Sequence, residues 1–208
     1  MTSLKQVVRK PVTLRRSAIT DQAETRSSSR IATRHAWWLV LLCFIVMASC
    51  HCARAATEAQ VKAAFIYNFA RFVEWPPQSF ASDDAPLTIG VMGGSPIADT
   101  LDQITKGKTI GGRRLAIKRL GSGDSPDGCH ILFIGASEKA RTGAILEKLR
   151  DSSVVTVGET GGFMRSGGVI GFVIENSKVA FEINAGAAKR KRLKISSQLL
   201  KLAKNVKD

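Results

Sequence analysis

Cys129 and His130 are the residues whose types and spacing come closest to a catalytic device. A thiol beside an imidazole can form a nucleophilic dyad, in which the ring takes the thiol proton. The two residues open the apolar run CHILFI, residues 129–134, which is bounded by glycines and is typical of a central strand buried on both faces. Neighbouring side chains in a strand point to opposite faces, so this pair cannot form a dyad. We interpret Cys129 as a small buried hydrophobe, and a redox-active thiol is the alternative.

No other stretch of the sequence predicts catalysis. A zinc site normally takes three or four Cys, His or carboxylate ligands, and beyond residue 55 the chain has one cysteine and one histidine. The phosphate-binding pattern G-x-x-x-x-G-K-[ST] and the dinucleotide fingerprint G-x-G-x-x-G are both missing from the sequence. We therefore predict no catalytic residue, no metal and no cofactor.

Two stretches are candidates for binding. Gly93, Gly94 and Ser95 follow a predicted strand at 87–92 and precede a predicted helix, where an anion or a small ligand could bind. The alternative is a tight turn with a capping serine. In the glycine-rich connection, residues 158–168, Phe163 and Met164 are candidate contacts for a protein partner. The alternative for Phe163 is that its ring folds back into the core.

The elements that must position these residues alternate between strand and helix. Strands are predicted at 87–92, 115–120, 129–134, 154–157, 169–174 and 179–183, and the last two flank a hairpin turn. Helices are predicted from Ile97 onward, at 140–150 and from about Ser196, with Ile195, Leu199, Leu202, Ala203 and Val206 on one face. This order predicts one α/β domain of the Rossmann-like sandwich type, with a mostly parallel mixed sheet and an antiparallel hairpin at one edge.

A further helix is predicted at 60–75, before the first strand. Its expected apolar stripe comprises Val61, Ala64, Phe65, Asn68, Phe69, Phe72 and Val73. Pro76 and Pro77 end it. We expect this helix to cover one face of the sheet.

The sequence of residues 1–55 predicts a leader. A basic segment precedes twelve apolar residues, 37–48, and Ala53-Arg54-Ala55 fits a small-x-small cleavage site. The apolar run is shorter than the roughly 20 residues of a membrane span. We predict an exported chain whose mature domain is 56–208, and lipidation at Cys50 is the weaker alternative.

Most of the formal charge of +14 lies at the two ends of the chain. The cations near the C-terminus are Lys189, Arg190, Lys191, Arg192, Lys194, Lys201, Lys204 and Lys207. This run is interpreted as a solvated helix face, with attraction to an anionic membrane as the alternative. Nucleic-acid binding is not predicted, because no aromatic residues are interleaved with the cations.

Several stretches together resemble the YfiR-like family of exported repressors of membrane diguanylate cyclases. The resemblance rests on EAQVKAAFIYNFARFVEWP at 58–76, CHILFIG at 129–135, VVTVGE at 154–159, GGVIGFVIENSKVAFEIN at 167–184 and the ending LKISSQLLKLAKNV. These stretches follow one another in order over nearly the whole of 56–208.

The resemblance implies a non-enzymatic periplasmic protein that binds the sensor domain of a diguanylate cyclase and inhibits the enzyme. Cyclic di-GMP and biofilm formation would then fall. It also implies a homodimer and an outer-membrane OmpA-like lipoprotein as a further partner. Family members can carry disulfides, whereas the mature part of this chain keeps only Cys129. A small-ligand sensor that uses Gly93, Gly94 and Ser95 is the alternative function.

Overall fold

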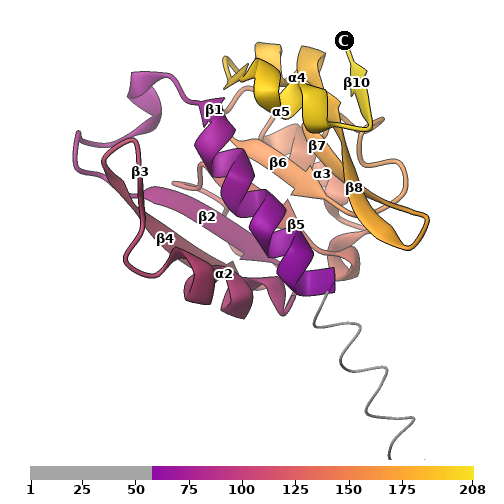
Figure 1. Ribbon diagram of the computed structural model, residues 1–208, viewed down its shortest axis with the longest axis horizontal. Coiled ribbons are helices and arrows are strands. Elements are labelled where there is room, and N and C mark those ends of the chain that lie inside the picture. Colours follow the sequence, from indigo (N-terminus) through magenta and orange to yellow (C-terminus); the bar gives the residue numbers. More distant parts are fainter. Residues whose placement is uncertain (1–57) are drawn as a thin grey trace, which may run out of the picture. The chain divides into compact units, whose positions relative to one another are not determined.

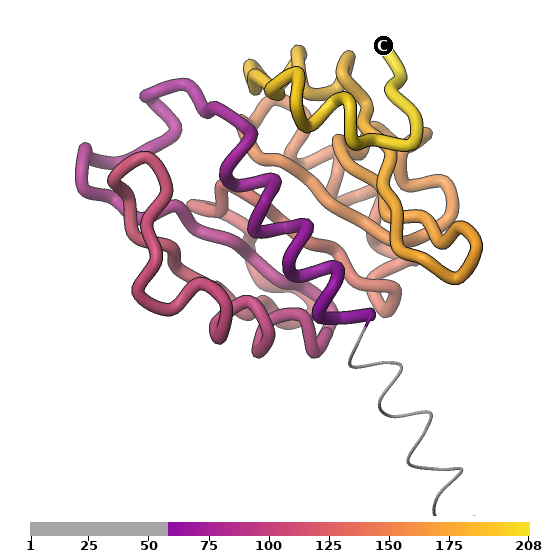
Figure 2. The backbone as a smooth tube through the Cα atoms, in the orientation of Figure 1, coloured from indigo at the N-terminus to yellow at the C-terminus, as the bar shows by residue number. Residues whose placement is uncertain are grey.

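The computed structural model describes residues 58–208, which form the α/β domain shown in Figure 1. Residues 58–72 are helical, and this opening helix lies across one face of the central sheet (Figures 1 and 2). It ends at Phe72, three residues before the predicted end at 75, because Val73 and Glu74 pair with a later strand instead of continuing the helix to Pro76. Within 58–208 no helix is long and apolar enough to cross a membrane.

The central sheet has eight strands in the order β10-β8-β7-β6-β5-β2-β4-β3. Their bounds are β2 Leu87–Met92, β3 Thr109–Ile110, β4 Arg113–Leu120, β5 Ile131–Ile134, β6 Val155–Gly158, β7 Ile170–Glu175, β8 Lys178–Asn184 and β10 Asn205–Lys207. Strands β4, β2, β5, β6 and β7 run parallel, whereas β8 is antiparallel to β7 and β3 is antiparallel to β4. The mostly parallel mixed sheet predicted from the sequence is therefore confirmed.

A small antiparallel sheet joins β1 (Val73–Glu74) to β9 (Lys194–Ile195). The remaining helices are η1 Pro77–Ser79, α2 Ile97–Thr105, η2 Ala136–Glu138, α3 Thr142–Lys148, α4 Ala185–Arg190 and α5 Ser197–Leu202. Because β1 follows the opening helix directly, this pairing fastens the end of that helix to the C-terminal segment.

Two apolar cores fill the faces of the sheet. The larger packs the opening helix, α2 and the C-terminal helices against alternate residues of the strands, such as Ile89, Phe133 and Val157. The smaller packs α3 against Leu132, Ile134 and their neighbours. Because β5 sends alternate residues into both cores, it is the doubly buried central strand that its apolar sequence predicts.

The predicted stripe of the opening helix was wrong in part. The buried side chains of this helix are those of Ala59, Lys62, Ala63, Ile66, Phe69 and Ala70, whereas Val61 and Ala64 are exposed. Apolar spacing placed the stripe about one residue away from its true position. Lys62 lies on the buried face, and a pattern of apolar residues alone cannot include a lysine.

The C-terminal end also differs from the prediction. Helix α5 stops at Leu202, and residues 205–207 add a strand, β10, parallel to β8 and outside the β7–β8 hairpin. The expected helical face is therefore interrupted: Leu199 is buried, but Leu202 and Val206 are exposed. The hairpin turn itself was predicted correctly, and Asn176 and Ser177 adopt the positive φ angles that its tight geometry requires.

Candidate interaction surface

His130 lies at the amino end of the sheet, and its ring makes contacts that hold the fold together. Its Nδ1 accepts a hydrogen bond from the Thr88 N–H at 3.0 Å, and its Nε2 lies 3.1 Å from the Ser79 carbonyl oxygen. Accepting at Nδ1 places the proton of the neutral ring on Nε2, which donates to Ser79. The ring stacks on Phe80 at 4.3 Å between centroids. Burial, with a contribution from Arg113, lowers the pKa of His130, so the ring is held neutral.

Cys129 points to the other face of the sheet, as strand alternation predicts. Its thiol belongs to the smaller core and packs against Gly90 and Leu132. Burial raises the pKa of Cys129, which disfavours the thiolate that any nucleophilic or redox chemistry needs. Within residues 58–208 it forms no disulfide. These contacts fit the interpretation of Cys129 as a core residue.

Gly93, Gly94 and Ser95 lie where β2 ends, between β4 on one side and β5 on the other. Ligands of open α/β sheets bind beyond the carboxyl ends of strands at such a point. Here Gly93 and Gly94 have φ angles of 98° and 58°, and the Ser95 Oγ accepts from the Ile97 N–H at 3.3 Å. The Gly93 carbonyl accepts a hydrogen bond from the Ser137 hydroxyl at 3.0 Å. These are the contacts of a turn with a cap, and the anion pocket stays a prediction.

A charged network lies beyond the carboxyl ends of β5 and β6. The ammonium of Lys62 on the opening helix contacts Glu159 at 2.5 Å and Glu58 at 2.6 Å. The second oxygen of Glu159 accepts from the backbone N–H of Ala136 at 2.9 Å. Burial lowers the pKa of Lys62, but its hydrogen bonds to the two glutamates outweigh that effect and raise it overall. The network thus connects the helix to two strand ends through a lysine that stays charged.

The glycine-rich connection continues from Glu159 and buries Phe163, which is only 3% exposed. Its ring lies against Gly158 and Gly168, where an added methyl group would overlap it. This is the core position that we gave as the alternative, so Phe163 does not present a free contact surface. The two glycines are needed because only hydrogen at these positions leaves room for the ring.

Met164 remains partly exposed and lies against Gly171 of β7. It lines an open groove of about 630 Å³ between the opening helix, the connection and the β7–β8 hairpin. Phe172, Val173 and Ile174 supply apolar lining, and charged groups complete it: Glu58, Lys62, Glu159, Arg165, Glu182 and Lys207. Ile174 is 58% exposed. Apolar side chains together with charged groups are the usual composition of a surface for a protein partner.

Met164, which the sequence predicts as a partner contact, lines this groove, whereas most of the other lining residues were not predicted. Lys62 and Glu159 are 97 residues apart, and nothing in the local sequence of either pairs them. The one available signal was a lysine among apolar residues of an amphipathic helix. Such a lysine either lies at the edge of the stripe or has a buried acidic partner.

The family to which the chain is similar matches it over nearly all of the residues that the structure describes. A family model described as YfiR/HmsC-like matches residues 59–204. The chain belongs to the YfiR/HmsC-like family. The YfiR/HmsC-like proteins are periplasmic regulators of diguanylate cyclase signalling rather than catalysts, which gives the chain a regulatory role at family level.

The other comparisons add little. No curated protein matches the chain. Among solved structures, a conserved domain protein from Vibrio cholerae O1 biovar El Tor is similar at 13% sequence identity, with a TM-score of 0.43. That match covers 58% of this YfiR/HmsC-like chain and 54% of the other chain.

Proposed function

We propose that the chain is exported to the periplasm. There it binds the periplasmic sensor domain of a membrane diguanylate cyclase and holds that enzyme inactive, so that cyclic di-GMP and biofilm formation fall. The observation that carries the proposal is the family match over residues 59–204. Export is supported by the leader sequence that ends at Ala55.

The groove beside Met164 is the surface we assign to the partner. A regulator without its own chemistry acts by contact, and contact surfaces need a few apolar anchors that a partner can cover. Met164 offers a flexible thioether, and Ile174 offers an exposed branched side chain in the same groove. The rim charges, among them Arg165 and Lys207, can then select the partner and its orientation.

Two further partners stay predictions from the resemblance alone: a second copy of the chain, and an outer-membrane OmpA-like lipoprotein. The ligand-sensor alternative would use Gly93, Gly94 and Ser95, whose present contacts are those of a turn. Isothermal titration with small anions distinguishes it from the regulator, because only the sensor binds such anions in the absence of a protein partner.

The experiment is affinity purification of the tagged, exported chain from membranes of the native cell. We expect it to enrich a diguanylate cyclase that has a periplasmic sensor domain, and deletion of the chain to raise cellular cyclic di-GMP. The intact mass of the purified chain should equal that of a polypeptide whose first residue is Ala56. Purification that recovers no cyclase, together with unchanged cyclic di-GMP in the deletion strain, would refute the proposal.

Groove variants then locate the contact. Met164→Asp and Ile174→Asp place a charge among the apolar anchors and should release the cyclase without unfolding the domain. Gln103→Asp makes the same addition on the exposed surface of α2 and is the matched control. If all three variants retain the cyclase equally, the partner binds to another surface of the domain.

A further inference from the structure

The net charge of the folded domain comes from one short segment. Residues 58–208 contain 22 Lys and Arg against 15 Asp and Glu. Residues 185–208 alone hold eight of those cations and one acidic residue, so residues 58–184 carry 14 charges of each sign and are neutral overall. The excess of positive charge is therefore local rather than spread over the domain.

This segment comprises α4, β9, α5 and β10, which lie together at one end of the domain (Figure 1, yellow). It is firmly folded, since Leu193 and Leu199 are buried in the larger core. The side chains of Asn184 and Ser196 also cap α4 and α5 through hydrogen bonds of 2.8 and 3.3 Å. A fixed surface, rather than a free tail, presents the cations.

Most of these cations are available to an outside partner. Seven of the eight are exposed, and Lys191 is the exception. Lys191 is buried and donates to the backbone carbonyl of Leu149 at the end of α3. Lys204 pairs with Glu175 at 2.8 Å, and no other exposed cation of the segment has an acidic partner within residues 58–208.

Exposed aliphatic side chains lie among the cations. Leu202 is 66% exposed and Val206 is 41% exposed, and each has an exposed lysine next to it in the chain. Aliphatic side chains held between basic residues are the composition of protein surfaces that adsorb to anionic bilayers. Single-stranded nucleic acid is disfavoured, because the segment contains no aromatic residue on which bases could stack.

We propose that this basic C-terminal surface, residues 185–208, binds the surface of an anionic lipid bilayer. The exposed lysines and arginines contact the lipid headgroups, while Leu202 and Val206 enter the boundary between headgroups and acyl chains. The inference goes beyond the proposed function and does not depend on a cyclase. Its consequence is that the domain is concentrated at a membrane.

Vesicle sedimentation tests the proposal with the exported protein. We expect binding to phosphatidylcholine vesicles that contain roughly 30% phosphatidylglycerol, and little binding to phosphatidylcholine alone. Raising the salt from about 0.05 M to about 0.5 M should weaken the binding severalfold, because the charges are screened. Equal binding to both vesicle types, or no binding to either, would overturn the proposal.

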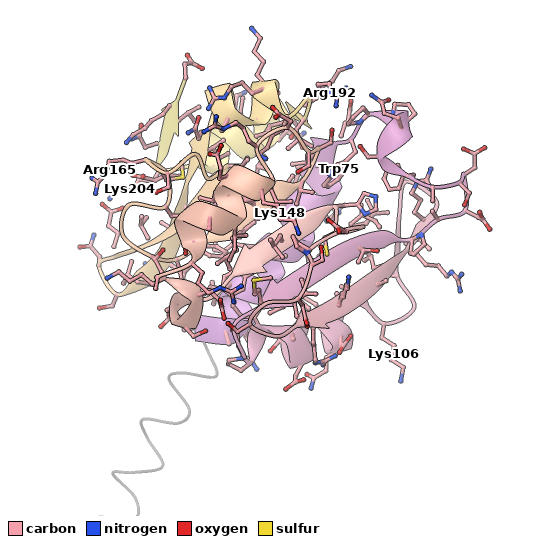
Figure 3. All side chains as sticks on the ribbon, turned by 180° about the vertical axis from the view of Figure 1, so that it is seen from behind. Trp75, Lys106, Lys148, Arg165, Arg192 and Lys204 are labelled. Carbon is pink, nitrogen blue, oxygen red and sulfur yellow. The ribbon has the colours of Figure 1, made fainter. Side chains whose placement is uncertain are left out.

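Charge variants separate this surface from the charge of the whole domain. Arg192→Glu with Lys201→Glu should weaken binding at least tenfold, since each cation near an anionic surface contributes about fivefold. Lys106→Glu with Lys139→Glu makes the same change in net charge at exposed positions elsewhere. Figure 3 shows Lys106 and Arg192 at opposite ends of the domain. Similar losses in the two pairs would mean that only net charge matters, which would refute a specific surface.

Aliphatic variants test the insertion. Leu202→Ser leaves the charge unchanged and should reduce the binding that survives high salt, whereas Val61→Ser, at an exposed position on the opening helix, should not. Unchanged melting temperatures establish that these variants fold. If vesicles fail to bind but immobilised polyglutamate retains the wild-type protein, the surface docks an acidic protein and the lipid proposal is wrong.

Discussion

The ammonium of Lys62 lies 2.5 Å from a carboxylate oxygen of Glu159, 97 residues further along the chain. This contact joins the opening helix to the point where the glycine-rich connection leaves β6, beside the groove we assign to the partner. Lys62 is buried and Glu159 is partly buried, so the pair is partly shielded from solvent.

Lys62→Met should lower the free energy of unfolding by about 1–3 kcal/mol, because it leaves the partly buried carboxylate of Glu159 without its cation. Adding Glu159→Gln should restore part of that loss, since a neutral amide still accepts the Ala136 hydrogen bond without leaving a partly buried charge unpaired. Urea unfolding of the single and double variants measures both effects. Arg119→Met removes an exposed cation with two acidic partners and should change stability little.

The raised pKa of Lys62 also fixes the direction of its pH dependence. A lysine whose folded-state pKa exceeds its unfolded value stabilises the fold fully below the usual value of 10.5. That contribution is lost as the pH rises through the raised pKa. The wild type should therefore lose stability above pH 10.5 more steeply than Lys62→Met. Parallel profiles for the two proteins would contradict the network as described.

Phe163 should behave as a core residue. Phe163→Ala leaves a cavity between Gly158 and Gly168, so we expect a loss of about 3–5 kcal/mol in unfolding free energy and a melting temperature lower by about 10 °C. Calorimetry measures both quantities. Met164→Ala is the neighbouring control and should cost much less, because Met164 is only partly buried.

Gly168→Ala tests the same packing from the other side. The added methyl group overlaps the Phe163 ring, and we expect a loss of about 1–3 kcal/mol. Gly161→Ala is a matched control, since nothing lies within 4 Å of a methyl group placed there. Equal stability of the two glycine variants would show that the ring does not depend on Gly168.

These residues also show what local sequence could predict. Strands with continuous apolar runs, such as β5, and the hairpin turn at Asn176 follow from short-range patterns, and they were predicted. The short strands β1, β3 and β10 were not, because two or three residues carry no periodicity and form only when a distant partner is in place. The burial of Phe163 similarly depends on glycines from two flanking segments, and the Lys62–Glu159 contact depends on the finished fold.

His130 should make stability depend on pH in the weakly acidic range. Its folded-state pKa lies below the usual 6.5 because of burial and Arg113, so the unfolded chain takes up the proton first. Its contribution is complete above pH 6.5 and falls as the pH drops toward the lowered pKa, by at most about 1.4 kcal/mol per pH unit. Protonation also removes the Nδ1 acceptor that Thr88 uses.

His130→Phe is the informative variant, because a phenyl ring keeps the stacking on Phe80 but cannot titrate. At pH 7 this variant should be less stable than the wild type, because it lacks the hydrogen bonds to Thr88 and Ser79. Between pH 6.5 and 5 its unfolding free energy should change less than that of the wild type. Denaturant unfolding at several pH values measures this difference, and identical slopes would exclude His130 as its source.

Cys129 should react slowly while the domain is folded. Its thiol is buried and the pKa is raised by that burial, so both access and thiolate formation are suppressed. We expect a thiol-specific disulfide reagent to label Cys129 much more slowly in the native protein than in urea.

Cys129→Ser should lower the unfolding free energy by about 1–3 kcal/mol, because a hydroxyl replaces a thiol among apolar side chains. Cyclase repression at permissive temperature should be unchanged. Native labelling as fast as that of the unfolded chain, or a response of repression to oxidant that Cys129→Ser abolishes, would instead establish a redox thiol.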